Sequence, residues 1–556
     1  MRSYYPFVRQ PMPSGVKIDE DIYVTMRDGV KIAVDIYRPE ATGRYPALLS
    51  TSPYLKHIQQ HPPELSHSIE AGATSFFVNR GYVHVIAQVR GSGLSQGKFN
   101  WYGIDEQKDG YELVEWIAQQ PWCNGNVGMI GESYFGVTQW LIAAQQPPHL
   151  KCIAPYDAHM DLYRARCEGG LIRMGFLGEW GIDTIHQCIW PGPVEGKQFP
   201  ENVFVDICSN PDDGPYYWER SAYTKIDQIK VPVLSLVSAH SVLHSRTQLW
   251  GYPLIKSPKK LIILPSVGFY SNVFFIRSRP LNELLLNWFD YWLKGIETGI
   301  MNLPPVAIYD SATGEWRYEN EYPLARTSWT KFYLHSNSSR PATKPPYGLL
   351  IPEPPGEEDP DSYITPNCLD LVAKGKPVVA YATPPLKEDM RVWGPLCAVI
   401  YGSSTTLDTA WFIKVGDVDS NGEVTLITQG HLKASYRDVD ESKSRPGQPF
   451  HPYQNPIRPE PNTIYEFQIE LTPIFYTFKK GHKIWMQIAS EDFTYHGMHH
   501  TLYTAEMLPV PAKNTIYHDS THPSYLLLPI IPDAPILKVV EPPISQIKWP
   551  LGGSIL

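Results

Sequence analysis

Apolar and polar positions alternate in short runs near the start of the chain, a spacing that predicts β-strands. Ile22–Met26 and Val30–Tyr37 flank Asp28-Gly29, a dipeptide that suits a tight hairpin turn. Further on, short apolar strands alternate with stretches in which apolar residues recur on one helical face. The strands are Tyr45–Ser50, Tyr82–Ala87, Val127–Ile130, Val231–Val237 and Leu261–Leu264, and the helices are Asp105–Gln120, Val137–Gln146 and about Leu281–Leu293. This order predicts an α/β fold with a parallel sheet covered by helices on both faces.

Two long segments depart from this alternation of strands and helices. Residues 157–225 are rich in Arg, Trp, Gly and Cys and lack strand alternation, which favours an inserted, mostly helical cap. From about Pro304 onward the pattern is of strands alone, separated by Gly, Pro and Asn turns, which is typical of a β-sandwich. We therefore expect an α/β domain in two parts, residues 1–156 and 226–303, a cap at 157–225, and a jelly-roll β-sandwich domain at 304–556.

Length and charge narrow the classes of function. The 556 residues suffice for two or three domains, and the net charge of −9 gives no electrostatic reason to bind nucleic acid or an anionic membrane. No apolar run approaches the roughly 18 residues of a membrane span, and residues 1–13 lack the apolar core of a signal peptide. The seven cysteines, an odd number without a C-x-x-C pair, favour free thiols. These features predict a soluble cytoplasmic protein; a homo-oligomer is left open.

The clearest chemical motif is a nucleophile elbow, Gly131-Glu132-Ser133-Tyr134-Phe135-Gly136. Val127–Ile130 is the strand before it, and Val137–Gln146 is the helix after it. A sharp strand-to-helix turn presents a serine hydroxyl at the helix N-terminus, where free N–H groups and the helix dipole stabilise developing negative charge. A short G-x-S match is weak alone, but this context makes Ser133 the predicted centre of the active site.

Longer segments around the elbow carry a family resemblance. Over nearly its whole length the chain resembles the CocE/NonD family of α/β-hydrolases, which includes cocaine esterase, α-amino-acid ester hydrolase and X-Pro dipeptidyl-peptidase. The segments that match are MRDGVKIAVDIYRPE (Met26–Glu40), STSPYLK (Ser50–Lys56), VRGSGLSQG (Val89–Gly97), EWIAQQPWCNGNVGMIGESYFGVTQW (Glu115–Trp140), FDYWLKG (Phe289–Gly295), VGDVDSNG (Val415–Gly422), FKKGHKIWMQIAS (Phe478–Ser490) and HPSYLLLPIIP (His522–Pro532).

The resemblance implies an architecture and an oxyanion hole. It implies an α/β-hydrolase domain with a helical cap and a jelly roll beside the active site. The family's elbow, G-x-S-Y-x-G, matches Gly131–Gly136, including Tyr134. By the same match, the backbone N–H of Tyr134 and the hydroxyl of Tyr54, in the pair Pro53-Tyr54, would hold the oxyanion. A phenol can donate to an oxyanion without carrying charge.

The chain departs from the family's pattern at the other two positions of the catalytic triad. The family's Asp follows the strand that Val231–Val237 matches, and here His240 occupies that position. The family's His follows the strand that Leu261–Leu264 matches, and here Gly268 stands near it. A serine without an adjacent base is a weak nucleophile. His240 is the leading candidate for a replacement base, followed by His244, His57 and His159.

Three functions remain open from the sequence. The first is hydrolysis of a small-molecule ester or amide at Ser133 with a non-standard base. The second is non-hydrolytic chemistry on a carbonyl compound, by an isomerase, lyase or cyclase that uses the same oxyanion hole for an enolate, with Ser133 or His240 as proton carrier. The third is a catalytically inactive relative that binds a small molecule.

Other candidate sites are weaker. His496, His499 and His500 have the look of metal ligands, but a loop cluster is favoured because no Cys or carboxylate lies at ligand spacing. Asp417 and Asp419 favour a β-turn over a cation site. We therefore expect no metal and no cofactor. Several cap residues are candidates for lining the substrate site: Arg164, Arg166, Glu168, Arg173 and Trp180.

Overall fold

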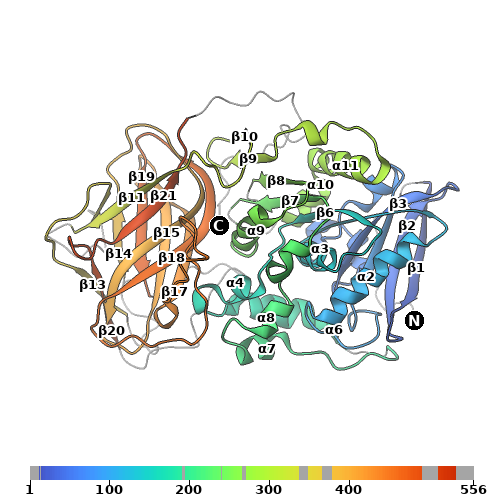
Figure 1. Ribbon diagram of the computed structural model, residues 1–556, viewed down its shortest axis with the longest axis horizontal. Helices are drawn as coiled ribbons and strands as arrows, with labels where there is room; N and C mark the ends of the chain where they lie inside the picture. The colour runs from blue at the N-terminus through green and yellow to red at the C-terminus, as the bar shows by residue number, and fades with distance from the viewer. Residues whose placement is uncertain are drawn as a thin grey trace.

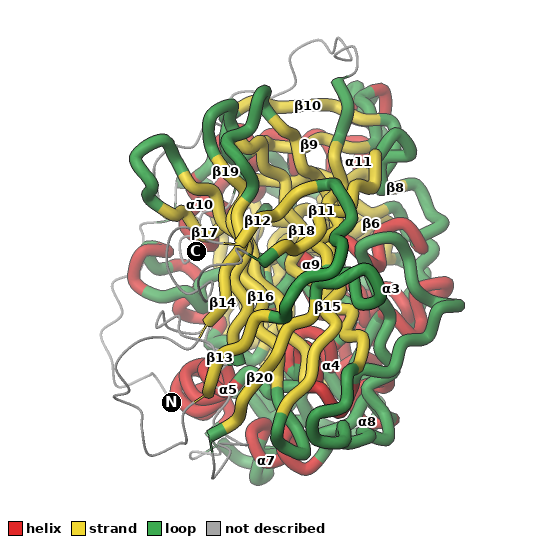
Figure 2. Tube along the Cα trace, turned by 90° about the vertical axis from the view of Figure 1, so that its left-hand side faces the viewer, coloured by secondary structure: helices red, strands yellow, loops and turns green. Residues whose placement is uncertain are grey.

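The computed structural model describes residues 12, 14–190, 194–239, 241–265, 271–336, 348–365, 378–490 and 511–533. They form an α/β unit and a β-sandwich that lie side by side (Figure 1). The expected alternation of strands and helices is present in the first unit, and the second is built from strands. Seen after a quarter turn, the sandwich strands β14, β15, β16 and β20 stand in front of the α/β unit (Figure 2).

The α/β unit is organised around a ten-stranded sheet of order β1-β2-β4-β3-β5-β6-β7-β8-β9-β10. At one side of the sheet β2 pairs antiparallel with both β1 and β4. From β4 the neighbouring strands pair in parallel, in the order β4, β3, β5, β6, β7, β8 and β9. The strands are β1 Val16–Thr25, β2 Lys31–Pro39, β3 Tyr45–Ser52, β4 Val83–Gln88, β5 Cys123–Glu132, β6 Leu150–Tyr156, β7 Val233–Ser238, β8 Lys259–Leu264, β9 Val306–Asp310 and β10 Glu315–Glu319. The carboxyl ends of β3, β5, β6 and β7 therefore meet at one edge, where such folds bind ligands.

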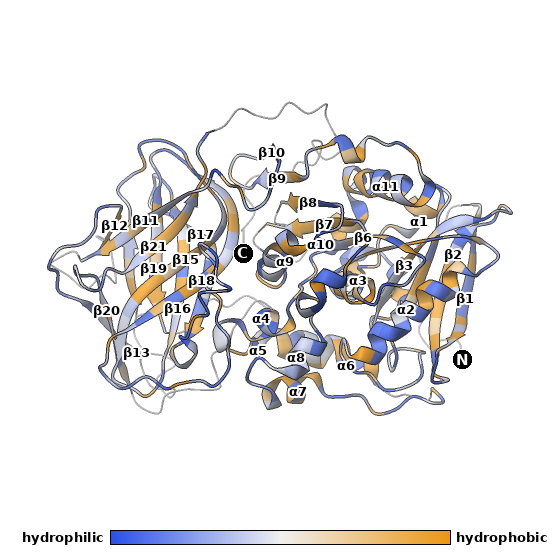
Figure 3. Ribbon diagram, viewed as in Figure 1, coloured by the Kyte–Doolittle hydropathy of each residue, from blue (hydrophilic) through white to orange (hydrophobic). Residues whose placement is uncertain are grey.

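Helices cover both faces of this sheet, as the alternation predicts. On one face lie α2 (Ile104–Ala118) and α3 (Tyr134–Ala144), and every residue of α3 is buried. On the other face lie α1 (Thr74–Val78), α10 (Ser271–Arg277) and α11 (Arg279–Lys294). Hydropathy follows this layering: β7 and β8 are coloured hydrophobic, whereas much of α2 is hydrophilic (Figure 3).

The chain between β6 and β7 folds into short helices, which confirms a mostly helical insertion. One of them, η4 (Leu177–Ile185), is a π-helical run of nine residues. Long π-helices are rare and concentrate at functional sites. The other segments are α4 Leu162–Arg166, η3 Glu168–Gly170, α5 Met174–Phe176, α6 His186–Ile189, α7 Val203–Ser209, α8 Pro215–Glu219 and η5 Tyr223–Gln228.

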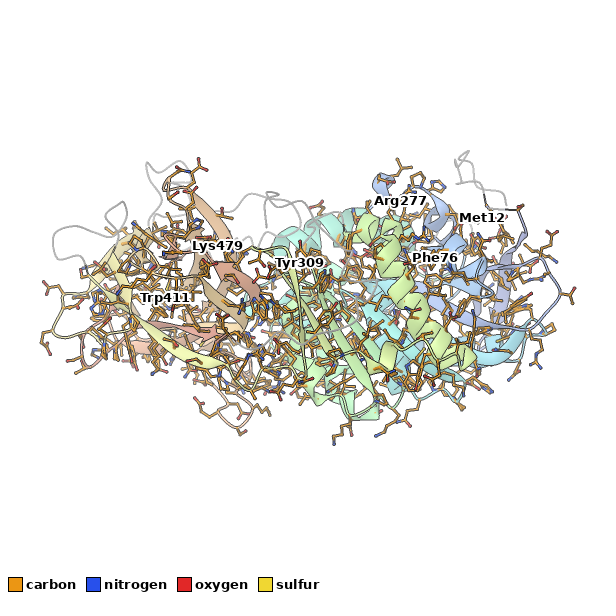
Figure 4. All side chains as sticks on the ribbon, turned by 90° about the horizontal axis from the view of Figure 1, so that it is seen from above. Met12, Phe76, Arg277, Tyr309, Trp411 and Lys479 are labelled. Carbon is orange, nitrogen blue, oxygen red and sulfur yellow. The ribbon has the colours of Figure 1, made fainter. Side chains whose placement is uncertain are left out.

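The C-terminal strands build a mostly antiparallel jelly-roll sandwich with an apolar interior. Trp411 is fully buried inside it, and Tyr309 lies near its junction with the α/β unit (Figure 4). The strands are β11 Ser328–His335, β12 Gly348–Ile351, β13 Asp361–Thr365, β14 Val378–Ala382, β15 Met390–Ser404, β16 Ala410–Val418, β17 Val424–Lys433, β18 Tyr465–Phe478, β19 Lys483–Ala489, β20 Ala512–Tyr517 and β21 Tyr525–Ile530.

Buried polar contacts join the sandwich to the cap and to α9 (Ser245–Gly251). Arg246 of α9 donates from Nε to Glu470 of β18 at 2.7 Å. Arg164 of α4 donates to the carbonyl of His451 at 2.7 Å. A Cβ on Gly169 would lie 2.0 Å from the carbonyl oxygen of His431, so the two backbones touch at this point. The sandwich therefore holds the cap in place from the side.

One boundary differs from the sequence expectation. The strands β9 and β10 follow residue 304, yet they extend the first sheet, because β9 pairs in parallel with β8 and β10 pairs with β9. Alternating polarity predicts a strand but does not say which sheet the strand joins. None of the helices in the described ranges is long and apolar enough to cross a membrane.

Candidate active site

Ser133 occupies the sharp turn between β5 and α3. Its φ and ψ are 55° and −114°, a conformation that non-glycine residues rarely adopt. Such strain costs about 1–3 kcal/mol and persists where the surrounding structure enforces it. Two hydrogen bonds hold the Ser133 backbone in this conformation. The Ser133 N–H donates to the carbonyl of Tyr156 at 2.9 Å, and the Val137 N–H donates to the Ser133 carbonyl at 2.8 Å.

The two glycines of the motif are required by close packing around this turn. A Cβ on Gly131, whose φ is 141°, would lie 2.3 Å from the Phe135 Cβ. A Cβ on Gly136 would lie 2.7 Å from the Ala158 Cβ. The predicted elbow therefore has the expected geometry, with Ser133 at the amino end of a buried helix.

Tyr54 follows β3 and lies against the start of α3, where the resemblance leads us to expect it. Its ring centroid is 6.1 Å from that of Tyr134 and 6.0 Å from that of Phe135, with edge contacts in both cases. The hydroxyl oxygen accepts a 2.8 Å hydrogen bond from Trp180 Nε1 in η4. Burial, and then the neighbouring Glu70, raise the pKa of Tyr54 well above its ordinary value, so the phenol stays protonated.

The backbone N–H and the side chain of Tyr134 lie in different surroundings. Its N–H belongs to the first turn of α3, where N–H groups lack partners inside the helix. Its side chain turns away: the hydroxyl donates to Glu106 at 3.0 Å and the ring packs on Tyr102 at 4.2 Å. Burial raises the pKa of Glu106 to about 8, against the opposing effect of the Tyr134 hydroxyl.

Three buried carboxyls gather beside Ser133, and the sequence reading missed them. Glu132 precedes Ser133, and its N–H donates to the carbonyl of Glu70 at 3.1 Å. Asp157 follows β6 and accepts from the N–H of Ser238 at 2.7 Å. Burial raises the pKa of each carboxyl, and repulsion among them adds to this for Glu70 and Glu132. The pKa of Asp157 rises to about 6, and the pKa values of Glu70 and Glu132 rise well above their ordinary value.

A signal for this cluster was present in the sequence. Glu132 lies inside the elbow motif and Asp157 directly follows a buried strand, both at positions that the fold brings to the ligand-binding edge. In the sheet Glu132 is the register partner of Tyr156, which places Ser133 beside Asp157. The fold therefore gathers three buried carboxyls with raised pKa values next to the serine.

His159 and His244 are stacked, with ring centroids 6.2 Å apart and planes 2° apart. His159 is buried, and neither ring nitrogen has a hydrogen-bond partner among the described residues. Burial lowers the pKa of His159 well below its ordinary value, with further lowering by Arg166 and His244, so its ring is neutral. His244 Nδ1 lies 3.3 Å from the Ser241 hydroxyl. His57 lies on η1 (Lys56–Gln60), after Tyr54.

The cap candidates divide into two groups. Trp180 contacts Tyr54, and Arg166 lies over the ring of Phe176, which stacks on Trp180. Arg164, Glu168 and Arg173 instead make buried ion pairs: Arg164 with Asp161 and Asp213, and Glu168 with Arg173 and Arg246. Only the first group reaches the surroundings of Ser133.

Several candidates lie outside the described residues: His240, Gly268, and the histidines His496, His499 and His500. Among the residues that are described, no group of His, Cys, Asp and Glu side chains is arranged to hold a metal. Asp417 is engaged by the Tyr476 hydroxyl and His482, and Asp419 accepts from the Asn421 N–H in a turn, as the β-turn interpretation predicts. The six cysteines in the described ranges are free, five of them buried.

Strand order, elbow and cap define this chain as an α/β-hydrolase with an appended jelly roll. Residues 28–267 match the family model of the X-Pro dipeptidyl-peptidase (S15 family), and residues 298–527 match that of the X-Pro dipeptidyl-peptidase C-terminal non-catalytic domain. The chain belongs to this family of hydrolases, so the expected family and architecture are confirmed.

Individual relatives span nearly the same length. Cocaine esterase of Rhodococcus is 27% identical over 92% of this chain and 98% of its own. A CocE/NonD family hydrolase from Staphylococcus aureus superimposes with a TM-score of 0.80, at 25% identity and 93% coverage of both chains. An α-amino acid ester hydrolase shares the fold with a TM-score of 0.71 at 19% identity, covering 95% of this chain and 98% of that one.

Proposed function

We propose that this protein is a serine hydrolase that cleaves an ester or amide of a small molecule at Ser133. The observation that carries the proposal is the strained Ser133 backbone, held at the amino end of α3, with the ring of Tyr54 packed against the next residue, Tyr134. Proteins keep such strain where it serves function. The names of the relatives, among them cocaine esterase, agree with this class of reaction.

The two oxyanion donors follow from the contacts around Tyr54. When Ser133 Oγ attacks a carbonyl carbon, the carbonyl oxygen becomes an oxyanion. The Tyr134 N–H at the amino end of α3 is one donor for it. Trp180 Nε1 already donates to the Tyr54 oxygen, so the Tyr54 proton is free to point at the oxyanion as the second donor. Each such donor contributes roughly 10²–10³ in kcat.

The base in this proposal is His240, oriented by Asp157. Asp157 is anchored by the N–H of Ser238, and Ser238 precedes His240 by two residues in the sequence. Relative to the family's pattern, both partners are displaced by one strand: the acid follows β6 in place of β7, and the base follows β7 in place of β8. His159 is a poorer base, because Arg166 and burial disfavour its protonated form.

A fluorophosphonate probe tests the nucleophile. We expect Ser133 to be labelled and Ser133→Ala to be inert to the probe and to 4-nitrophenyl acetate. His240→Ala should lower kcat by about 10²–10⁴-fold, and Asp157→Asn by less, because it acts through the imidazole. His149→Ala is the control, since His149 precedes β6 at the far edge of the sheet and binds Glu115. Absence of labelling together with full turnover by Ser133→Ala would reject the serine mechanism.

A second candidate function rests on the buried carboxyls. Burial and mutual repulsion raise the pKa of Glu132 and Glu70 well above its ordinary value, and one oxygen of each has no hydrogen-bond partner among the described residues. Carboxyls with raised pKa values beside an oxyanion hole suit proton transfer to and from a carbonyl compound, as in an isomerase, lyase or cyclase. In that case Glu132→Gln abolishes turnover of the native substrate while Ser133→Ala preserves it. A ligand that binds without any turnover would indicate the inactive relative.

A further inference from the structure

Arg166 is a buried arginine of the cap, on α4. Its side chain is 3% exposed, and no carboxylate among the described residues pairs with it. Its one hydrogen bond runs from Nη1 to the adjacent Ala165 carbonyl at 3.3 Å, and its Nε has no partner. By contrast, the other buried arginines in and beside the cap all pair with carboxylates: Arg164, Arg173 and Arg220 of the cap, and Arg246 of α9.

Aromatic rings connect Arg166 to the proposed oxyanion hole. The guanidinium lies 4.0 Å over the ring of Phe176 and 5.7 Å from that of Trp101. Both rings pack against Trp180, at 5.0 Å and 5.2 Å. Trp180 in turn donates to the hydroxyl of Tyr54. A chain of packed rings therefore connects Arg166 to Tyr54, and the Tyr54 phenol also acts electrostatically on the guanidinium.

His159 faces the same place with a second unpaired group. Its ring lies 5.7 Å from that of Tyr102, and Tyr102 packs on Tyr134, the residue after Ser133. Both of its ring nitrogens are buried and without hydrogen-bond partners among the described residues. The charge of Arg166 also lowers the pKa of His159, which agrees with the two side chains lying near each other. Arg166 and His159 thus both carry buried nitrogen atoms without hydrogen-bond partners among the described residues.

An unpaired buried charge destabilises a folded protein unless something compensates for it. A guanidinium fork matches the two oxygens of a carboxylate, and a neutral imidazole can add one N–H donor. A dianionic phosphate fits less well, because Arg173, whose charge acts on Arg166, is already engaged by Glu168. We propose that Arg166 and His159 bind a carboxylate group of the substrate, which makes the enzyme selective for esters or amides that carry a free acid.

This inference rests on the proposed hydrolysis for the reaction but not for the binding. It assigns the part of the substrate that would contact the cap, where Arg166 lies over the ring of Phe176. Its test therefore uses one kinetic and one non-kinetic readout. The probes are mono(4-nitrophenyl) glutarate and its terminal amide, 4-nitrophenyl glutaramate, which differ only in carboxylate against carboxamide.

With the full-length protein, we expect kcat/KM for the glutarate ester to exceed that for the glutaramate ester by about 10–100-fold, the range for a charged hydrogen bond. In Ser133→Ala, which cannot turn the esters over, calorimetric titration should show the same preference in Kd. Equal kcat/KM and equal Kd for the two probes would overturn the inference. A preference in Kd without any labelling of Ser133 would uphold it while rejecting the proposed hydrolysis.

Substitution separates a binding role from a structural one. Arg166→Gln should bring the ratio of the two probes close to one, and Arg166→Lys should retain part of it. The Tm of free Arg166→Gln should equal or exceed that of the parent, because the variant removes an unpaired charge. Arg220→Gln is the matched control, a buried cap arginine that pairs with Glu219, and it should lower the Tm and keep the ratio. A lowered Tm with an unchanged ratio in Arg166→Gln would assign Arg166 to structure alone.

Discussion

Trp180 in the cap donates a 2.8 Å hydrogen bond to the hydroxyl of Tyr54 in the α/β unit, across 126 residues of chain. The bond ties an element that borders the substrate site to a proposed oxyanion donor. Because the donor is an indole N–H, it fixes the orientation of the phenol without introducing charge. The cap is thereby coupled to the chemistry as well as to substrate choice.

Removing the Tyr54 hydroxyl tests this coupling. Tyr54→Phe should lower kcat on 4-nitrophenyl acetate by roughly 10²–10³-fold, the loss expected for one oxyanion donor. Trp180→Phe should lower kcat less, because the phenol proton remains but loses its fixed direction. Steady-state kinetics on the two variants check this. Equal and small losses in both would exclude Tyr54 as a donor to the oxyanion.

Backbone strain at Ser133 predicts an inverted order of stability. Ser133→Gly should be more stable than Ser133→Ala by about 1–2 kcal/mol, because glycine adopts φ near 55° without steric cost. At an ordinary exposed helical site the order is the opposite. Urea denaturation of both variants measures the difference. If the alanine variant is the more stable one, the turn is not strained in solution.

Glu106 predicts a specific pH dependence of stability. The unfolded carboxyl loses its proton near its ordinary pKa of 4.5, whereas the folded one keeps it until about pH 8. Folding therefore takes up a proton between these values, and the free energy of unfolding falls as pH rises through this range, by about 1.4 kcal/mol for each pKa unit.

Chemical denaturation between pH 5 and pH 9 measures this slope. Glu106→Gln, which mimics the protonated acid toward Tyr134, should reduce this slope, and the remainder comes from the other buried carboxyls with raised pKa values, such as Asp157. Glu283→Gln on the partly exposed side of α11 is the control and should leave it unchanged. An identical slope in the parent and in Glu106→Gln would show that another group is responsible.

The pair Arg246–Glu470 joins the α/β unit to the sandwich in a buried setting. Arg246→Met should cost about 3–5 kcal/mol, because it leaves the Glu470 carboxylate without its main partner. The double variant Arg246→Met, Glu470→Leu should recover much of this loss, since well-packed apolar residues often replace a buried ion pair at little cost. Thermal unfolding of the single and double variants gives the comparison. A double variant no more stable than the single one would contradict it.

The sequence predicted those features that are encoded locally. The elbow at Gly131–Gly136 specifies its own backbone conformation through two glycines, so its geometry followed from the motif. The layered α/β unit followed from the change between the periods of strand and helix. The position of Tyr54 beside α3 was expected only through the resemblance, and the contact with Tyr134 agrees with it.

What the sequence could not predict depends on how distant segments meet. Glu132 and Asp157 become neighbours only through the register of β5 against β6, which the pattern of polarity does not specify. Arg166 looked like any other cap arginine, because the absence of an acidic partner is visible only after folding. The roles of His240 and Gly268 stay predictions, since both lie outside the described residues.

The attachment of β9 and β10 to the first sheet bears on how this enzyme can be divided. The two family matches leave a gap between residues 267 and 298, which invites cutting the gene there. A fragment ended at that gap would lack the two outermost strands and expose the parallel edge of β8, a template for aggregation. A hydrolase fragment that is to fold without the sandwich therefore has to include β10, which ends at Glu319.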